Sequence, residues 1–293
     1  MTLCDSCNQD QCTAATQKPG ESKEAYRERQ KLESRMCRVK RKIVILSGKG
    51  GVGKSTIAVN LAAGLKAMGL KTGLLDVDIH GPSIPTMLGL ENNALMGTEE
   101  GLVPLDLNGL KVISSGFFLK SQDDAVIWRG PMKANVIRQF LQDVIWGDLD
   151  LLVIDSPPGT GDEPLSVCQL IKNLDGAVIV TTPQKVATVD VRKSITFCRQ
   201  LKVPVLGLIE NMSGFACPKC GEISPIFGSG GGQRIAVDMG IPFLGAIPID
   251  PQVAAAEDMG QIPIELDAST TAAQHMRTIL KTLAEMTAVV KAA

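Results

Sequence analysis

Residues 48–56 read GKGGVGKST and directly follow the apolar run Ile43–Ser47. This is the pattern G-x-x-x-x-G-K-[ST], and it stands in the strand–loop–helix setting that a phosphate-binding loop requires. The glycines allow successive N–H groups to point inward, and the N-terminus of the next helix, predicted over Ile57–Met68, adds about half a positive charge. The sequence therefore predicts a site that wraps a nucleoside triphosphate, formed by Gly48, Lys49, Gly50, Gly51, Val52, Gly53, Lys54, Ser55 and Thr56.

Three side chains of this loop have separate expected tasks. We expect Lys54 to reach the β- and γ-phosphates, Ser55 to bind Mg²⁺, and Thr56 to donate a hydrogen bond to the α-phosphate. An enclosed triphosphate also needs a metal ion to offset its charge. The ligands of this metal ion are therefore expected at the ends of neighbouring strands.

Two apolar runs end in carboxylates that suit this metal. LLDVD ends in Asp76 and Asp78, and LLVID ends in Asp155. Because Mg²⁺ keeps much of its hydration shell, a carboxylate at a strand end usually holds it through a bound water. We assign Asp155 to the metal, whereas Asp76 could instead be a carboxylate that caps its strand. Gly159 and Gly161 follow soon after and offer a hinge that could respond to the γ-phosphate.

Short apolar runs alternate with amphipathic segments along the rest of the chain. Seven candidate strands are rich in β-branched residues or leucine without two-residue alternation, which is typical of strands covered on both faces. The clearest helix, Met132–Trp146, carries one apolar stripe. This alternation predicts an α/β fold with a mostly parallel, doubly wound sheet and ligands at the carboxyl ends of its strands. The candidate strands are Ile43–Ser47, Gly73–Val77, Leu110–Ser114, Leu151–Asp155, Ala177–Thr181, Val205–Glu210 and Phe243–Ile247.

Charge and hydropathy argue against several classes of protein. With a net charge of −1 and a pI of about 6.2, the chain has no global attraction for nucleic acid or anionic lipid. No apolar run reaches the roughly 18 residues of a membrane span, and the N-terminal residues lack the apolar core of a secretory signal. We therefore expect a cytoplasmic protein with no nucleic-acid or membrane partner. Its eight cysteines should then stay reduced and serve metal binding rather than disulfides.

The second lysine of the loop, Lys49, marks a departure from the ordinary motif. GKGGVGKST resembles the deviant Walker A sequence of the SIMIBI-type dimeric ATPases, which include MinD, ParA, the nitrogenase iron protein and the Mrp-type cluster carriers. The resemblance implies that Lys49 reaches across a dimer interface to the partner's nucleotide and acts in catalysis with Lys54. It further implies that Asp78 positions or deprotonates the attacking water, that Asp76 supports the metal shell, and that Asn211 binds adenine. No N-K-x-D guanine signature is visible, so ATP is favoured over GTP.

Further blocks in the same order narrow the resemblance to the Mrp/ApbC-type iron–sulfur cluster carriers, over roughly residues 40–290. Besides the loop, these blocks are DVDIHGPSIPTMLG at 76–89, DSPPGTGDEPLS at 155–166, ENMSGFACPKCG at 210–221 and IFGSGGG at 226–232. The family implies an ATPase that binds a transferable [4Fe–4S] cluster at a homodimer interface and delivers it to apo iron–sulfur proteins. The rival hypothesis is a MinD/ParA-like positioning ATPase with a structural zinc site. Its basic amphipathic C-terminal helix is not evident in LKTLAEMTAVVKAA.

Cys217 and Cys220 form a C-x-x-C pair that can present two thiolates to one metal. A cluster or a zinc ion binds four ligands, of which this pair supplies two. The same two cysteines of a second copy, related by a two-fold axis, could supply the other two. Completion within one chain by N-terminal cysteines, as in a zinc knuckle, is the alternative, and thiolate ligation alone does not distinguish zinc from iron and sulfide. A redox dithiol is a third interpretation. The N-terminal candidates are Cys4, Cys7 and Cys12, which could also hold a second cluster.

The chain is expected to divide near residue 40. Residues 1–40 would form a flexible, cysteine-containing arm and a charged, solvated helix within Glu21–Lys42, whose basic end is Arg35–Lys42. Residues 41–293 would form the P-loop ATPase domain with the C-x-x-C metal loop. Cys168 and Cys198 lie in apolar segments and are expected to be small core residues. His80 is interpreted as a contact residue and His275 as a solvated one.

Overall fold

A computed structural model describes residues 16–118, 130–217, 219–266 and 270–289 of the chain. Its centre is a sheet of nine strands in the described part, in the order β10-β9-β8-β1-β7-β2-β6-β5, with β11 also paired to β9. The strands from β9 to β6, and β11, run parallel, whereas β10 and β5 are antiparallel edges. The parallel strands are β1 (Val39–Ser47), β2 (Thr72–Asp76), β6 (Leu110–Ser114), β7 (Leu149–Asp155), β8 (Gly176–Thr181), β9 (Val205–Ala216) and β11 (Phe243–Ile249).

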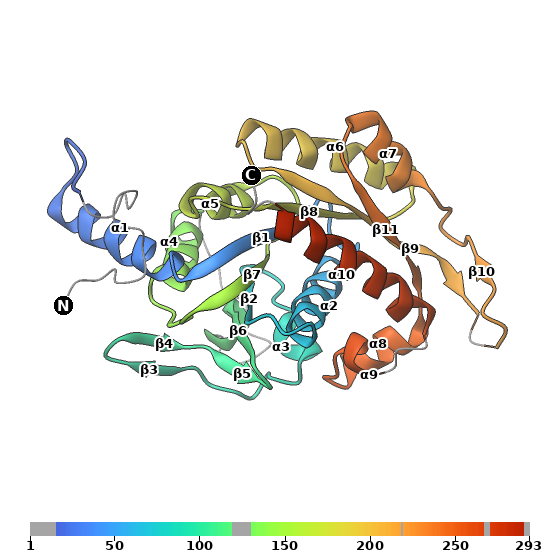
Figure 1. Ribbon diagram of the computed structural model, residues 1–293, viewed down its shortest axis with the longest axis horizontal. Coiled ribbons are helices and arrows are strands. Elements are labelled where there is room, and N and C mark those ends of the chain that lie inside the picture. Colours follow the sequence, from blue (N-terminus) through green and yellow to red (C-terminus); the bar gives the residue numbers. More distant parts are fainter. Residues whose placement is uncertain (1–15, 119–129, 218, 267–269, 290–293) are drawn as a thin grey trace.

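Helices cover both faces of this sheet (Figure 1). One face packs against α2 (Lys54–Ala67), α3 (Ile84–Met87), α8 (Pro251–Asp258), α9 (Pro263–Leu266) and α10 (Thr271–Val289). The other face packs against α1 (Lys23–Met36), α4 (Gly130–Gln142), α5 (Asp162–Leu170), α6 (Lys185–Gln200) and α7 (Gly231–Met239). Two apolar layers result, so the strands are buried on both sides, as their unalternating sequences predicted. The doubly wound α/β prediction is confirmed.

Smaller elements complete the chain. The edge strands β5 (Leu105–Leu107) and β10 (Ile223–Ser224) extend the main sheet, while β3 (Met96–Thr98) and β4 (Gly101–Val103) form a separate antiparallel pair. A 3₁₀ turn spans Ser115–Phe118. In Figure 1 the β9–β10 hairpin projects from one end of the molecule and α1 from the other.

The predicted strands occur with shifted ends, but the predicted helix Met132–Trp146 is wrong at its C-terminus. Helix α4 ends at Gln142, and Val144 then forms a parallel bridge with Leu102. The N–H of Ile145 also donates to the carbonyl oxygen of Leu102, at 2.8 Å. The residues at 144–146 are β-branched or aromatic and favour an extended chain once a partner strand is available. The apolar stripe therefore continues beyond the helix as an extended segment.

The charged segment after residue 20 is less solvated than its composition suggested. Helix α1 begins after Ser22, whose hydroxyl accepts the N–H of Ala25 at 3.1 Å, and it buries Leu32 and Met36 against the layer that contains α4. The interpretation of Arg35–Lys42 as an exposed helix end is wrong, because β1 already starts at Val39. Periodic apolar residues among the charges gave the helix a packing face.

Lys42 illustrates this correction. Its side chain is buried within β1, and its amine donates to the carbonyl oxygen of Val39 at 2.9 Å. Its backbone N–H donates to the Asp175 carboxylate at 2.7 Å. A lysine can occupy such a position when its amine finds acceptors and its alkyl stem packs against apolar neighbours. The division near residue 40 therefore falls inside a strand.

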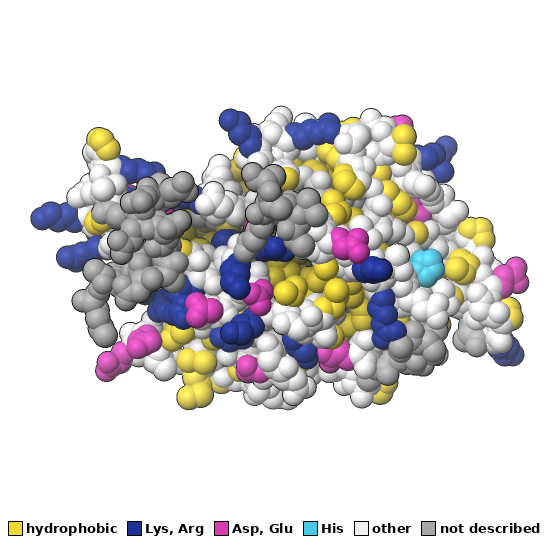
Figure 2. Space-filling model, in the orientation of Figure 1, with side chains coloured by type: hydrophobic (Ala, Val, Ile, Leu, Met, Phe, Trp, Pro, Cys, Tyr) yellow, Lys and Arg dark blue, Asp and Glu magenta, His cyan; other side chains and the backbone are white. Residues whose placement is uncertain are grey.

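Charges of both signs are interspersed over the face seen in Figure 2. This mixed pattern agrees with the near-zero net charge and gives that face no large field of one sign. Within the described residues, no helix combines the length and the apolar composition needed to cross a bilayer.

Candidate functional site

The P-loop connects β1 to α2 and ends in a network of three polar side chains. Helix α2 starts at Lys54, three residues earlier than predicted, after Gly53 in the left-handed conformation at φ 76°. The Lys54 amine forms an ion pair with the buried Asp155 carboxylate and also donates to Ser55 Oγ at 3.3 Å. Ser55 Oγ in turn donates to the other Asp155 oxygen at 2.5 Å. Lysine, hydroxyl and carboxylate are therefore held together by contacts with one another.

Two glycines of the loop are required by their surroundings. A Cβ at Gly48 would lie 2.4 Å from the backbone of Asp190, and one at Gly53 would lie 2.2 Å from the Asn211 amide nitrogen. Gly53 also has a φ that side chains rarely adopt. The loop can thus approach its neighbours closely and leave its N–H groups for a ligand, which is the feature that fits it to a triphosphate.

Asp76 and Asp155 are direct neighbours on β2 and β7, as their positions at strand ends predicted. Asp76 is fully buried and accepts hydrogen bonds from Ser114 Oγ at 2.8 Å and from the Asp78 N–H at 3.0 Å. Burial, helped by the nearby charge of Asp155, raises the pKa of Asp76 to about 8. A carboxyl so enclosed and bonded fits a role behind the metal shell better than that of a direct ligand. It also orients Asp78.

A cleft of about 220 Å³ lies over the loop. It brings together the phosphate-binding backbone, Lys49, Asp78 and Pro158, which the sequence analysis had placed in separate motifs. The N–H of Gly159 donates to the Ser47 carbonyl oxygen at 2.8 Å and fastens the segment after Asp155 to the end of β1. Hydroxyl and carboxylate oxygens next to a phosphate cradle are the donor set that Mg²⁺ prefers, so Ser55 and Asp155 fit a nucleotide-bound Mg²⁺.

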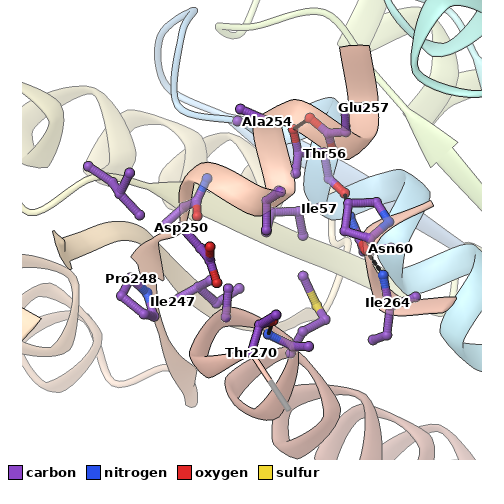
Figure 3. Close-up of a pocket in the computed structure, with 18 of the residues that line it drawn as sticks. Thr56, Ile57, Asn60, Ile247, Pro248, Asp250, Ala254, Glu257, Ile264 and Thr270 are labelled. Atoms are coloured by element: carbon purple, nitrogen blue, oxygen red, sulfur yellow. Dashed lines mark hydrogen bonds between the residues drawn. The ribbon is translucent and has the colours of Figure 1, made fainter. Parts of the chain in front are cut away.

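A second, more apolar cavity of about 270 Å³ opens beside the first and shares Gly53 and Thr56 with it. Asn211, in the middle of β9, lies on its wall and donates its amide N–H to the Val52 carbonyl oxygen at 2.9 Å. Figure 3 shows Pro248 and Asp250 on one side of this cavity and residues of α2 on another. An apolar space with a few polar groups beside a phosphate loop suits a nucleoside.

Sequence reasoning identified Asn211 but missed the rest of this wall. Pro248 near the end of β11, Asp250 just after that strand, and Glu257 of α8 also line the cavity. The strand end at Ile249 carried a signal, because carboxyl ends of parallel strands meet at one edge. Glu257 gave no such signal, since it contacts Thr56 across 201 positions of sequence.

Cys217 and Cys220 lie in the turn of the β9–β10 hairpin. The Cys217 N–H donates to the Glu222 carbonyl oxygen at 2.9 Å, and the Gly221 N–H donates to the Cys217 carbonyl oxygen at 2.8 Å. Cys217 is half-buried and Cys220 exposed. Hydrogen bonds to the Cys217 sulfur from the backbone of Lys219, and also from Cys220, lower the pKa of its thiol and favour the thiolate that binds metals.

The hairpin does not complete a metal site by itself. The described part of the chain contains no group of three or more His, Cys, Asp or Glu side chains placed to hold a metal ion. Cys4, Cys7 and Cys12 fall outside the described residues, so their predicted role is not tested. The turn therefore offers two sulfur ligands to a metal that must find the others elsewhere.

One strand connects this turn to the nucleotide edge. Asn211 of β9 pairs with Ile247 of β11, and Phe215 of β9 pairs with Ile249 of β11. Between these two pairs β9 advances by four residues while β11 advances by two, so β9 contains extra residues that bulge out of the pairing. Met212 at φ 56° and Gly214 at φ 84° form the resulting bulge. Bulges of this kind redirect the strand that follows. Here that strand leads directly to Cys217.

The remaining cysteines and histidines are peripheral to both sites. Cys198 is fully buried and Cys168 half-buried in one apolar cluster, and burial raises the pKa of their thiols to about 12 and about 11. They are core residues, as predicted. The interpretation of His275 as solvated is wrong, because its ring is half-buried with Nδ1 2.6 Å from the Ala246 carbonyl oxygen. His80 lies 3.7 Å from Glu163, in agreement with a contact role.

A family model described as ParA: NUBPL iron-transfer P-loop NTPase matches residues 38–284. The chain belongs to this family. An iron–sulfur cluster carrier protein of Methanocaldococcus jannaschii is 48% identical over 277 residues, which cover 94% of this chain and 95% of that protein. A cytosolic Fe–S cluster assembly factor, the Nubp2 homologue of Aedes aegypti, is 52% identical over 240 residues, covering 80% and 93%. The predicted membership of the iron–sulfur branch of the deviant Walker ATPases is confirmed.

Solved structures agree with this membership. A nucleotide-binding protein from Archaeoglobus fulgidus in complex with ADP is 42% identical, has a TM-score of 0.72, and is matched over 80% of this chain and 92% of its own. The septum site-determining protein MinD of Pyrococcus horikoshii has a TM-score of 0.61 at 22% identity, over 85% and 98%, which shows a common fold alone. The chain is thus a P-loop NTPase of the iron-transfer family.

Proposed function

We propose that this iron-transfer P-loop NTPase hydrolyses ATP and, as a homodimer, carries a transferable [4Fe–4S] cluster that it delivers to apo-proteins. The observation that carries the proposal is the half-complete sulfur site: Cys217 and Cys220 lie on an exposed turn without a third ligand among the described residues. Two such pairs, one from each copy across a two-fold axis, supply the four thiolates of a cluster. The names of the relatives from M. jannaschii and A. aegypti point to the same cargo.

The surroundings of the turn support pairing between copies. Ile223, Ile226 and Phe227 follow Cys220 closely and are each more than two-fifths exposed. Exposed apolar side chains grouped on a projecting hairpin are typical of an interaction surface. Burial of these side chains against their symmetry mates would hold the two turns together and shield the cluster from water.

Nucleotide hydrolysis is assigned to the residues around the P-loop. Lys54 binds the β- and γ-phosphates, Ser55 and Asp155 hold Mg²⁺, and Asp78 orients the attacking water. When bound, Mg²⁺ offsets the charge that develops on the transferred phosphoryl group. Lys49 lines the cleft, and its side-chain amine has no hydrogen-bond or ion-pair partner among the described residues, which leaves the amine available to a nucleotide in the partner copy.

Asn211 and the apolar cavity are assigned to the adenine. Because Asn211 lies on β9 and Cys217 directly follows the end of that strand, six positions further on, a shift of β9 on nucleotide binding would reach the sulfur turn directly. Exposed ligands on a projecting turn also suit a cargo that must leave, whereas permanent clusters have a completed outer shell. We infer that the nucleotide state changes how tightly the cluster is bound. We also infer that the protein acts in the cytoplasm, because the names of the NUBP2 relatives describe those proteins as cytosolic.

The proposal is tested by anaerobic reconstitution of the full chain with iron and sulfide. Iron and acid-labile sulfide are quantified per dimer, and the mass of the loaded species is measured by light scattering. We expect about four irons per dimer and their loss in Cys217→Ala, with Cys168→Ala as the matched control. Unchanged iron in Cys217→Ala would move the site to the N-terminal cysteines. Zinc retained in place of iron, or a monomeric loaded species, would contradict the carrier proposal.

A further inference from the structure

Glu257 of α8 is a carboxyl group inside the nucleotide cavity to which no role has been assigned above. Its Oε2 accepts a hydrogen bond from the Thr56 hydroxyl at 3.0 Å (Figure 3). Its Oε1 is buried and has no hydrogen-bond partner within the described part of the chain. A buried carboxylate oxygen without a partner is costly, so such a group usually has a ligand or a changed protonation state.

Thr56 is the residue expected to donate a hydrogen bond to the α-phosphate, and its hydroxyl has only one proton to donate. In this structure that proton is directed to Glu257. A bound phosphate oxygen and an ionised Glu257 are both acceptors and both negatively charged. They cannot receive the same proton, and they repel each other across the threonine.

Among the described residues, no cation is paired with Glu257. Burial is the main cause that raises the pKa of Glu257 to about 7, and the charge of the neighbouring Asp258 adds to the effect. Asp250, at the start of α8, accepts the N–H of Gln252. Within the described part of the chain, α3 and α9 contribute no free positive charge against α8: α3 reads IPTM, and in α9 Glu265 pairs with Lys66 of α2. Lys54 is bound to Asp155.

We propose that Glu257 is a positioning residue for the nucleotide: when ionised, it competes with the α-phosphate for the Thr56 proton, whereas when neutral it donates to Thr56 Oγ1 and leaves that proton for the phosphate. The 3.0 Å contact between Thr56 Oγ1 and Glu257 Oε2 fits both protonation states of Glu257. Thr56 is the donor when Glu257 is ionised, and Glu257 is the donor when it is neutral. Nucleotide binding then takes up one proton on Glu257 wherever this group is ionised in the free protein. This inference rests on nucleotide binding at the P-loop as proposed above.

The sign of the pH dependence follows. Below pH 7 the free carboxyl is already neutral, and binding is at its strongest. Above pH 7 an increasing fraction is ionised, and the apparent affinity falls with the fraction of the competent state. One unit above the pKa about a tenth of the molecules remain neutral, so affinity at pH 8 should be about tenfold below its low-pH limit.

Glu257→Gln separates this role from a structural one. The carboxamide has the same shape and a permanent N–H donor for Thr56 Oγ1, so it imitates the neutral acid. Titration calorimetry of the full chain with ADP and Mg²⁺ at pH 6, 7 and 8 should give equal affinities for wild type and Glu257→Gln at pH 6. At pH 8 the variant should bind about tenfold more tightly. Titrations in buffers of different ionisation enthalpy should show one less proton taken up at pH 8 by the variant.

Ionisation of the ADP phosphates is common to both proteins and cancels in the comparison. Glu265→Gln removes a surface carboxylate near the same helix and should follow the wild-type profile. In a Thr56→Val background, Glu257→Gln should lose its effect, because the proton in question is absent. Parallel pH profiles for wild type and Glu257→Gln would overturn the inference. Weaker binding by Glu257→Gln at every pH would also overturn it, since the carboxylate would then accept a hydrogen bond from the nucleotide. Absence of ADP binding in all folded variants would instead refute the proposed nucleotide site.

Discussion

The nucleotide edge and the sulfur turn are built in opposite ways. At the P-loop, the buried Lys54 and Asp155 and the half-buried Ser55 are bonded to one another. At the β9–β10 turn, Cys217 and Cys220 lie at the surface, and the described residues add no further ligand. The comparison teaches that the P-loop side chains find their bonding partners within one subunit, whereas the described residues supply only two ligands at the turn. A preorganised site suits repeated chemistry, and an incomplete one suits a load that is shared and released.

The largest effect is expected for Lys54→Ala, which breaks the preorganised site. Removal of the amine leaves the Asp155 carboxylate buried without its ion-pair partner, and such losses typically cost about 3–5 kcal/mol of folding stability. Urea unfolding measures this cost, and ATP hydrolysis should be abolished. Lys66→Ala removes the partly exposed pair with Glu265 and should cost less than about 1 kcal/mol. Equal costs for the two variants would mean that the P-loop pair is not preorganised.

The next effect tests whether the nucleotide edge is really complete within one subunit. Lys49→Ala should lower the ATP turnover number by about a hundredfold or more, the range for loss of one group that stabilises developing charge. ADP affinity should change little, because the resemblance directs this lysine to the partner's nucleotide. Mixed dimers of Lys49→Ala and a hydrolysis-deficient Asp78→Asn chain supply the control, since only one of their two sites retains Asp78 and its facing lysine. Full turnover by Lys49→Ala would refute the cross-dimer role.

A smaller effect compares cysteines of the core with those of the turn. Cys198→Ser places a hydroxyl in an apolar cluster and should cost about 1–3 kcal/mol of folding stability. Cys217→Ser, at the exposed turn, should change stability by less than about 0.5 kcal/mol while preventing iron retention. Chemical unfolding of the metal-free proteins measures both. A large cost for Cys217→Ser would show that the turn also serves the fold.

The smallest change is a difference in thiol reactivity. Because hydrogen bonds lower the pKa of Cys217, its thiolate fraction rises at a lower pH than for an ordinary cysteine. Burial has the opposite effect on Cys198, whose pKa is raised to about 12. Iodoacetamide with mass spectrometry should therefore label Cys217 in the folded, metal-free protein near neutral pH, and Cys198 only after unfolding. Cluster loading should protect Cys217. Labelling of both at equal rates would contradict the contrast between core and turn.

The local sequence was sufficient to predict an element where the residues of a short segment alone determine its structure. The buried strands were recognisable from apolar runs longer than an exposed strand would carry, although β9 continues to Ala216, six residues past its predicted end at Glu210. The P-loop follows from its own glycines and lysine. The helix predicted over Met132–Trp146 was extended too far because Val144 finds Leu102, a partner about forty positions away. Such pairing has no trace in the periodicity of the segment itself.

The candidate site divides in the same manner. Asp76 and Asp155 were identifiable because each ends an apolar run, and the sheet brings them into register. Glu257, Pro248 and Asp250 were missed because their positions beside α2 depend on how the C-terminal part of the chain folds back over the sheet. Cys217 and Cys220 were recognisable from spacing, but the ligands that complete their site cannot be deduced from one copy of the chain.

The bulge at Met212 and Gly214 lies between Asn211 and Cys217, so the number of residues in this segment determines where Cys217 lies relative to Asn211. In a strand, side chains alternate between the two faces, so one inserted or deleted residue would turn both thiols to the opposite side of the molecule. Two copies altered in this way would present their sulfurs back to back with their nucleotide clefts still apposed. Under the proposed function, the length of this short connection would therefore decide whether a nucleotide-dependent shift of β9 reaches the two cysteines in the right orientation.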